Sequence, residues 1–268
     1  MTVSDYALKL SEAELARYRL MAEAAARAEA DLWTACGVRG GAVVADVGCG
    51  PGAMSLVIAD LVGPTGRVLA VDRDPTAVDA ARAAVAHAGA GNVAVATGEA
   101  DDTGIAPGSV DVVMIRHVLA HNGGREDAIV RHATTLVRPG GYVYLVDIEA
   151  GGLRIRPPDA DFEDLDARYR RWHEQRGNDL SVGLRLAELL AAARLEAIEH
   201  HGRYQIVRLP PGMRPPSWAA RDALVADGLA TADDVERWAA AFEKADRAEE
   251  RPTLFAPLFF AFGRRPAA

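Results

Sequence analysis

Residues 43–53 read Val43-Val44-Ala45-Asp46-Val47-Gly48-Cys49-Gly50-Pro51-Gly52-Ala53, an apolar segment that runs directly into a glycine-rich turn. The β-branched residues show little alternation, which predicts a central parallel strand covered on both faces. Glycines let the backbone turn sharply and approach a ligand closely. An apolar helix follows at once, and its free N–H groups point at the same place. The segment therefore predicts a binding site for a negative or strongly polar group.

The glycine turn by itself fits two kinds of cofactor. Gly48, Gly50 and Ala53 match the dinucleotide-binding pattern G-x-G-x-x-A. Asp72 ends the next apolar strand, where a carboxylate reaches ribose hydroxyls in either case. Asp46 distinguishes between the two kinds of cofactor, because a carboxylate at the end of the first strand repels the pyrophosphate of a dinucleotide. It attracts an ammonium group, such as that on the amino-acid end of S-adenosylmethionine (SAM).

Further segments follow the turn in a consistent order, and together they resemble class I SAM-dependent methyltransferases. The resemblance runs from about Val43 to Asp147. One position departs from the family pattern, which more often has Asp where this chain has Glu99. The segments that carry the resemblance are residues 46–52, Asp72, Gly98-Glu99-Ala100-Asp101, residues 109–114, residues 136–141 and residues 142–147.

The resemblance implies an α/β fold with a Rossmann-like, doubly wound, mostly parallel seven-stranded sheet, an N-terminal helical lid and helical cap insertions. Strand and helix patterns that alternate between residues 42 and 148 independently predict a parallel doubly wound sheet. The lid is expected to be helical from about Glu12 to Cys36. The expected divisions are a lid (1–37), a SAM-binding core (38–148), a cap insertion (149–181) and the C-terminal part of the core (182–268), with a helical insertion at about 208–252.

The resemblance also implies SAM as cofactor and S-adenosylhomocysteine as product. Asp46 and the glycine turn are expected to hold the methionine end, and Asp72 the ribose hydroxyls. Glu99 and Ala100 are expected to meet the adenine edge. Such ligands bind at the carboxyl ends of parallel strands. The predicted cofactor contacts are Tyr18, Asp46, Gly48, Cys49, Gly50, Gly52, Asp72, Arg73, Glu99, Ala100 and Arg116.

Two histidines after the fourth strand, His117 and His121, are the candidate catalytic residues. A histidine there can deprotonate a hydroxyl or amine as it is methylated. The alternative is that they contact the cofactor or are hydrogen-bonded in the wall of the site and do no chemistry, because methyl transfer often needs only positioning and desolvation. Further residues expected to face the site are Tyr6 and Arg17 in the lid, and Tyr169, Trp172 and His173 in the cap.

Composition and charge limit the substrates, the location and the metals that we expect for this protein. The formal net charge of −8 argues against a nucleic-acid substrate, which calls for a concentrated basic surface. We expect no membrane span and no signal peptide, because no apolar run is long enough to span a bilayer and residues 1–5 have neither a basic start nor an apolar core. With only Cys36 and Cys49, the chain suits a reducing cytoplasm. No metal is expected, because His200 and His201 are adjacent on a predicted strand and point to opposite faces.

The sequence favours a SAM-dependent methyltransferase that acts on a small molecule, with O-methylation ahead of N- or C-methylation, in specialised metabolism. Three alternatives stay open: a SAM-binding enzyme that catalyses another reaction, such as a cyclisation; a nicotinamide-dependent oxidoreductase; and a non-catalytic SAM-binding subunit. Amphipathic stretches at both ends of the chain are compatible with a homodimer.

Overall fold

The computed structural model describes residues 12–267, in which eight strands form one sheet. The strands are β1 (Val43–Val47), β2 (Arg67–Asp72), β3 (Val93–Thr97), β4 (Val110–Arg116), β5 (Val137–Ile148), β6 (Arg154–Arg156), β7 (Glu196–Arg208) and β8 (Thr253–Arg264). Their order is β3-β2-β1-β4-β5-β8-β6, and β7 pairs with β8. Strands β1 to β5 run parallel to one another, whereas β8 is antiparallel to β5, β6 and β7.

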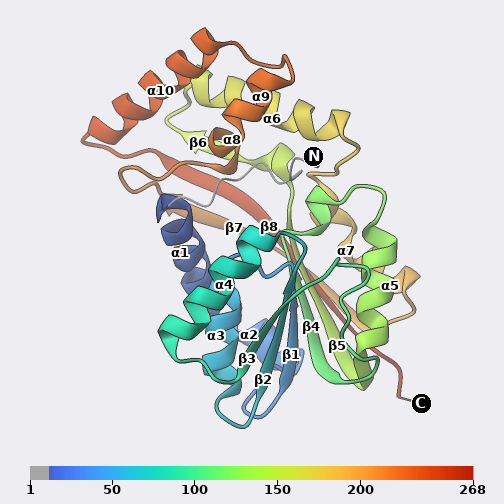
Figure 1. Cartoon of the computed structure of the whole chain (residues 1–268). Helices are drawn as coiled ribbons and strands as arrows, with labels where there is room; N and C mark the ends of the chain where they lie inside the picture. The colour runs from blue at the N-terminus through green and yellow to red at the C-terminus, as the bar shows by residue number, and fades with distance from the viewer. Residues whose placement is uncertain (1–11, 268) are drawn as a thin grey trace.

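Helices cover both faces of this sheet (Figure 1). The helices are α1 (Glu12–Ala28), α2 (Ala30–Ala35), α3 (Ala53–Val62), α4 (Pro75–Ala88), α5 (Glu126–Leu136), α6 (Ala160–Gln175), α7 (Leu186–Ala192), α8 (Pro216–Ala219), α9 (Arg221–Ala226) and α10 (Ala232–Arg247). Three short 3-10 helices, η1 (Leu119–His121), η2 (Ala150–Gly152) and η3 (Val182–Arg185), join them. Among these described residues, no helix is long and apolar enough to cross a membrane.

Two apolar clusters hold the helices to the sheet. Residues of α1, α2 and α3 pack on one face, and residues of α5 and α7 pack on the other. Strand β1 lies in the middle, with Val44, Ala45 and Val47 all buried. Both faces of β1 are therefore covered, which is why its apolar residues do not alternate with polar ones. The doubly wound α/β fold is confirmed.

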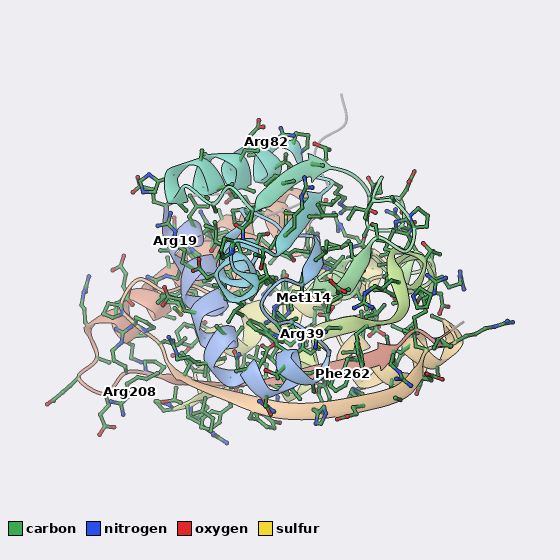
Figure 2. The ribbon with its side chains drawn as sticks, turned by 90° about the horizontal axis from the view of Figure 1, so that it is seen from below. Arg19, Arg39, Arg82, Met114, Arg208 and Phe262 are labelled. Carbon is green, nitrogen blue, oxygen red and sulfur yellow. The ribbon has the colours of Figure 1, made fainter. Side chains whose placement is uncertain are left out.

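The view from below shows how side chains divide between core and surface (Figure 2). Met114 on β4 and Phe262 on β8 are buried in the same apolar cluster. Arg82 on α4 and Arg208 at the end of β7 are exposed and lie at the periphery of the view. The two strands therefore contribute to one core although about 150 residues separate them in the chain.

The two regions expected as separate insertions pack against each other. One apolar cluster joins α6, from residues 149–181, to α8, α9 and α10, from residues 208–252. Ion pairs cross the same contact, with Arg237 bonded to Asp161 and Asp164. Trp238, fully buried on α10, also donates to Asp164. These helices form a layer at one end of the sheet in Figure 1, beyond the carboxyl ends of the parallel strands.

Two details differ from the sequence-based expectation. The sheet has eight strands instead of seven, because the short segment Arg154–Arg156 pairs with β8. The lid segment is not one continuous helix: it is divided at Glu29, whose φ of −119° leaves the helical range, into α1 and α2. This break turns the Glu29 side chain into the protein, where it has partners described below. Residues 1–11 of the expected lid, including Tyr6, lie outside the described residues.

Candidate functional site

The glycine turn after β1 has a geometry that requires glycine. Gly48, Gly50 and Gly52 have φ values of +77°, +53° and +82°, which side chains rarely adopt. A Cβ on Gly48 would overlap a methyl carbon of Val118, and one on Gly52 would lie 3.0 Å from Cβ of Ala81. Gly52 is also the N-cap of α3, so the unpaired N–H groups at the start of that helix face the turn.

Asp72 connects the end of β2 to this turn. Its carboxylate accepts hydrogen bonds from the backbone N–H of Gly50, at 2.8 Å, and from that of Asp74, at 3.0 Å. The neighbouring Arg73 donates to the side-chain oxygen of Asn122, which follows η1, at 3.4 Å. Asp72 therefore lies beside the turn at the carboxyl edge of the sheet, in agreement with its predicted place at the end of the second strand.

Asp46 is buried, with 2% of its surface exposed. Its Oδ2 accepts a hydrogen bond of 2.6 Å from the hydroxyl of Ser55 on α3. Burial raises its pKa to about 6, although Ser55 and the charge of Arg116 oppose the shift. Asp46 thus joins the strand to the helix that follows the turn, and Cys49 in the turn is buried beside it.

Arg116 is held by a partner that the sequence analysis missed. Both terminal nitrogens of Arg116 donate to the carboxylate of Glu29, at 2.5 and 3.0 Å. Glu29 is fully buried and also accepts from the hydroxyl of Tyr144 and the indole N–H of Trp33. Glu29 lies four positions after Ala25 and four before Trp33, both buried, and this helical spacing with apolar residues was the available signal. The guanidinium of Arg116 therefore secures the lid to β4 and β5.

Three histidines gather at the carboxyl ends of β4 and β5. Burial, more than neighbouring charges, lowers the pKa of His117 to about 3, of His121 to about 4 and of His173 to about 3. All three are therefore neutral near pH 7. The rings of His121 and His173 lie 4.9 Å apart, and the ring of Tyr169 meets that of His173 edge-on at 4.5 Å.

His117 has an unusual backbone and environment. Its φ is +54°, a left-handed conformation that a residue with a side chain seldom adopts. Nδ1 lies 3.9 Å from Oδ1 of the fully buried Asp147. Nε2 is buried and has no hydrogen-bond partner among the described residues, and the same holds for Nε2 of His173. Two buried ring nitrogens at this edge of the sheet thus have no hydrogen-bond partner among the described residues, and each can donate to or accept from a bound ligand.

Three further residues were predicted to contact the cofactor: Tyr18, Glu99 and Ala100. The ring of Tyr18 on α1 lies 3.7 Å from where a Cβ on Gly50 would be. Glu99 is exposed and bonds Arg125, which also binds Asp101. Ala100 is half-buried against the core. Across residues 12–267, no group of three or more His, Cys, Asp or Glu side chains is arranged to hold a metal ion.

Asp147 makes stability depend on pH. Burial raises the pKa of this carboxyl from 3.8 to about 7, despite hydrogen bonds from the N–H groups of Ala120 and Ile148. Between about pH 4 and 7 the native side chain is protonated and the unfolded one is ionised, so the unfolded state binds fewer protons. The free energy of unfolding therefore falls as pH rises, by about 1.4 kcal/mol per pH unit from this group.

Replacing Asp147 with asparagine removes this titration. We compare the free energy of unfolding of Asp147→Asn with that of wild type by urea denaturation. As pH rises from about 5 to 7, we expect the difference, variant minus wild type, to increase by about 2 kcal/mol, because only the wild type loses stability through this group. Asp79→Asn, at an exposed site on α4, is the control and should keep the wild-type pH dependence. Parallel pH curves for Asp147→Asn and wild type would contradict the expectation.

Comparison with known proteins gives a family model and curated relatives that are named as methyltransferases. A family model described as a methyltransferase domain matches residues 39–183. Nocamycin O-methyltransferase of Saccharothrix syringae is 36% identical over 107 residues, which cover 40% of this chain and 38% of that protein. Arsenite methyltransferase of Halobacterium salinarum is 32% identical over 126 residues, covering 44% and 32%. The chain thus spans about a third of the length of these curated relatives.

Solved structures share the fold at low sequence identity. The YcgJ protein of Bacillus subtilis aligns with a TM-score of 0.59 at 17% identity, covering 89% of this chain and 98% of that one. Phosphoethanolamine N-methyltransferase 2 of Haemonchus contortus, in complex with SAM, gives 0.54 at 16%, covering 89% and 52%. The [4+2]-cyclase SpnF gives 0.54 at 20%, covering 92% and 83%.

Proposed function

This chain belongs to the methyltransferase domain family, and we propose that it transfers the methyl group of SAM to a small-molecule acceptor. SAM is its cofactor. The observation that carries the proposal is the turn after β1, in which Gly48, Gly50 and Gly52 keep the backbone in left-handed conformations beside the carboxylate of Asp72. The residues present fit the cofactor, because an open turn and an acid at adjacent strand ends match its methionine and ribose groups.

Each predicted contact takes a role in this proposal. The turn and α3 would hold the methionine end through backbone N–H groups, while the buried Asp46 keeps strand and helix together. Asp72 would accept the ribose hydroxyls. Tyr18 would cover the turn from α1, and Glu99 with Ala100 would border the adenine. The list of proposed cofactor contacts is Tyr18, Asp46, Gly48, Cys49, Gly50, Gly52, Asp72, Arg73, Glu99 and Ala100. Arg116 acts on the site through Glu29 and the lid.

The histidines favour an acceptor that loses a proton. SAM, when bound, supplies a methyl carbon on a cationic sulfur that a nucleophile attacks in line. A hydroxyl acceptor forms the new O–C bond as the S–C bond breaks, and its proton needs a base. Nε2 of His117 is neutral and unpartnered among the described residues, so it would accept that proton as the S–C bond breaks, with His121 beside it. Its lowered pKa makes it a weaker base than an ordinary histidine, so its role depends on its position. We therefore favour O-methylation over N- or C-methylation, in specialised metabolism.

If His117 is the base, activity should depend little on pH in the acidic range. A base must be neutral to act, and the lowered pKa of His117, about 3, keeps it neutral throughout. We expect kcat/KM to change less than about twofold between pH 5 and pH 7 from this group. Initial rates in buffers of constant ionic strength measure it. A loss of activity centred near pH 6.5 that disappears in His117→Gln would argue for an exposed, ordinary histidine.

The first experiment is calorimetric titration of the wild-type chain with SAM and S-adenosylhomocysteine. Micromolar-range binding, followed by methylation of hydroxyl, amine or carbon acceptors in a screen, is the expected result. Binding of a nicotinamide dinucleotide instead would move the function to hydride transfer. Binding of SAM with turnover of an acceptor that gains no methyl group would favour a reaction such as a cyclisation. We also propose that the lid and the cap cover the site. We propose a cytoplasmic location for the protein.

A further inference from the structure

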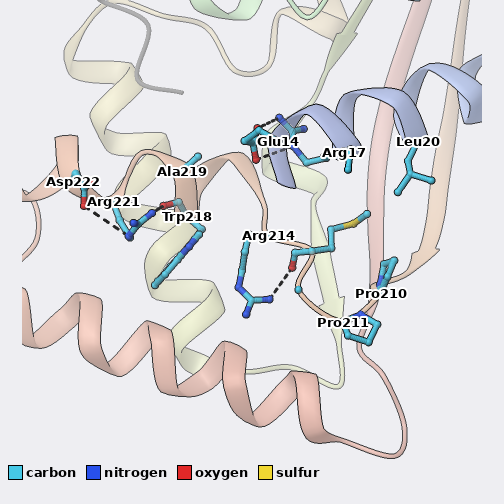
Figure 3. Close-up of a pocket in the computed structure, with 13 residues that line it drawn as sticks. Glu14, Arg17, Leu20, Pro210, Pro211, Arg214, Trp218, Ala219, Arg221 and Asp222 are labelled. Carbon is cyan, nitrogen blue, oxygen red and sulfur yellow. Dashed lines mark hydrogen bonds and ion pairs between the residues drawn. The ribbon is translucent and has the colours of Figure 1, made fainter. Parts of the chain in front are cut away.

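A cavity of about 550 Å³ lies between α1 and the segment from Pro210 to Asp222 (Figure 3). Much of its wall is apolar and includes Leu20, Met213 and Trp218. In Figure 3, Leu20 extends from α1 and Trp218 from α8, on opposite sides of the space. Sites for small organic molecules typically measure about 300–1,000 Å³ and are lined mainly by apolar side chains with a few polar groups. The cavity has the size and lining of such a site.

Three arginines border the cavity, and each is paired with a carboxylate. Arg17 binds Glu14 at 2.7 Å, and Arg214 binds Asp246 at 2.6 Å. The Nε of Arg221 lies 3.7 Å from Asp222. The wall therefore carries little net charge, although guanidinium N–H groups remain present along it.

Paired charges of this kind disfavour a charged guest. An anion entering the cavity would meet Glu14 and Asp222 as well as the arginines, and a cation would meet the arginines. Either would lose its hydration in a largely apolar space without gaining a free counter-ion, which is costly. An uncharged molecule loses little hydration free energy on entering the cavity, and its oxygen atoms can accept hydrogen bonds from guanidinium N–H groups.

Helix α1 connects this cavity to the cofactor turn. Arg17 lines the cavity, while the next residue, Tyr18, lies against Gly50 of the turn. Burial first, and then charges that include Arg17, lower the pKa of His117. Burial raises the pKa of Tyr169, and the charge of Arg17 opposes that rise. The charge of Arg17 therefore acts on His117 and Tyr169, and one turn of α1 carries both a residue that lines the cavity and a residue that lies against the glycine turn.

We propose that this cavity receives the methyl acceptor, and that the acceptor is an uncharged, mostly apolar molecule bearing oxygen groups. The inference rests on the proposed methyltransferase function and goes beyond it by naming the class of substrate and the residues that select it. Met213, Leu20 and Trp218 contact its hydrocarbon part. The guanidinium group of Arg221 orients its oxygen atoms.

The test uses two probes with the same fluorescent ring system. Dansylamide is uncharged, and 5-dimethylaminonaphthalene-1-sulfonate carries a negative charge. Wild-type protein should bind one dansylamide per chain, at least about tenfold more tightly than the sulfonate. Ala16, which lines the cavity, is replaced by tryptophan to fill it. Ala30→Trp, at an exposed position on α2, is the matched control.

Ala16→Trp should lose dansylamide affinity by at least about tenfold, while Ala30→Trp keeps it. Both variants should bind S-adenosylhomocysteine as the wild type does. Equal dansylamide binding by Ala16→Trp and wild type would overturn the location, and equal binding of the two probes would overturn the substrate class. An acceptor that is methylated but does not displace dansylamide would also overturn the proposal. Failure of the wild type to bind S-adenosylhomocysteine would instead refute the proposed function.

Discussion

Replacing Glu29 with alanine is expected to lower the free energy of unfolding by about 3–5 kcal/mol, because the change leaves a buried charge without its partner. Glu29 is fully buried and binds both terminal nitrogens of Arg116, at 2.5 and 3.0 Å. The Arg116 side chain is only 10% exposed, so we expect water to compensate poorly for the lost carboxylate. Tyr144 and Trp33 lose an acceptor at the same time.

Urea denaturation of Glu29→Ala and wild type measures this effect. The matched control is Glu196→Ala, since Glu196 forms an ion pair of similar length with Arg264 at the surface. Exposed pairs contribute about 0–1 kcal/mol, so the control should change little. The double variant Glu29→Met/Arg116→Met should recover most of the lost stability, because it removes both charges together. A loss below about 1 kcal/mol in Glu29→Ala would mean that Arg116 reaches solvent when unpaired.

Replacing Asp72 with alanine is expected to weaken S-adenosylhomocysteine binding by at least about 100-fold, or about 2.7 kcal/mol. Two effects add. The carboxylate would lose its proposed bonds to the ribose hydroxyls, and hydrogen bonds to charged groups contribute about 1.5–3 kcal/mol. The turn would also lose the bond from the Gly50 N–H to Asp72, which holds the backbone at φ +53°.

Calorimetric titration of Asp72→Ala, Asp72→Asn and Asp79→Ala separates these effects. An asparagine side chain at this position would keep one oxygen for the Gly50 N–H but lose the charge, so Asp72→Asn should fall between wild type and Asp72→Ala. Asp79 is an exposed acid on the neighbouring α4, and its removal should leave the affinity unchanged. Wild-type affinity in Asp72→Ala would remove Asp72 from the cofactor site.

Local sequence was informative wherever conformation depends on neighbouring residues. The glycines of residues 48–52 predicted a sharp turn, and the structure has positive φ values there that favour glycine. The uniform apolar run of β1 predicted a strand covered on both faces, which the burial of its residues confirms. Helix α4 begins at Pro75, a residue that suits the first turn of a helix, and ends at Ala88, before Gly89 in a left-handed conformation.

Pairing between residues far apart in the chain was not predictable. Glu29 and Arg116 are 87 positions apart, and nothing near either residue indicates the other. The same holds for the packing of α6 on α10, which joins two segments that the sequence analysis treated separately. Such contacts depend on how the whole sheet and its helices enclose each side chain, and single-sequence periodicity reports only which face of an element is apolar.

The chain's own sequence thus determined its doubly wound core and the cofactor turn, because strand burial and glycine geometry arise from residues adjacent in the chain. Only the tertiary structure decided that Arg116 binds Glu29, that His117 lies neutral beside Asp147, and that a cavity opens between α1 and residues 210–222. Each of these depends on burial and on distances between segments that meet only after the chain has folded.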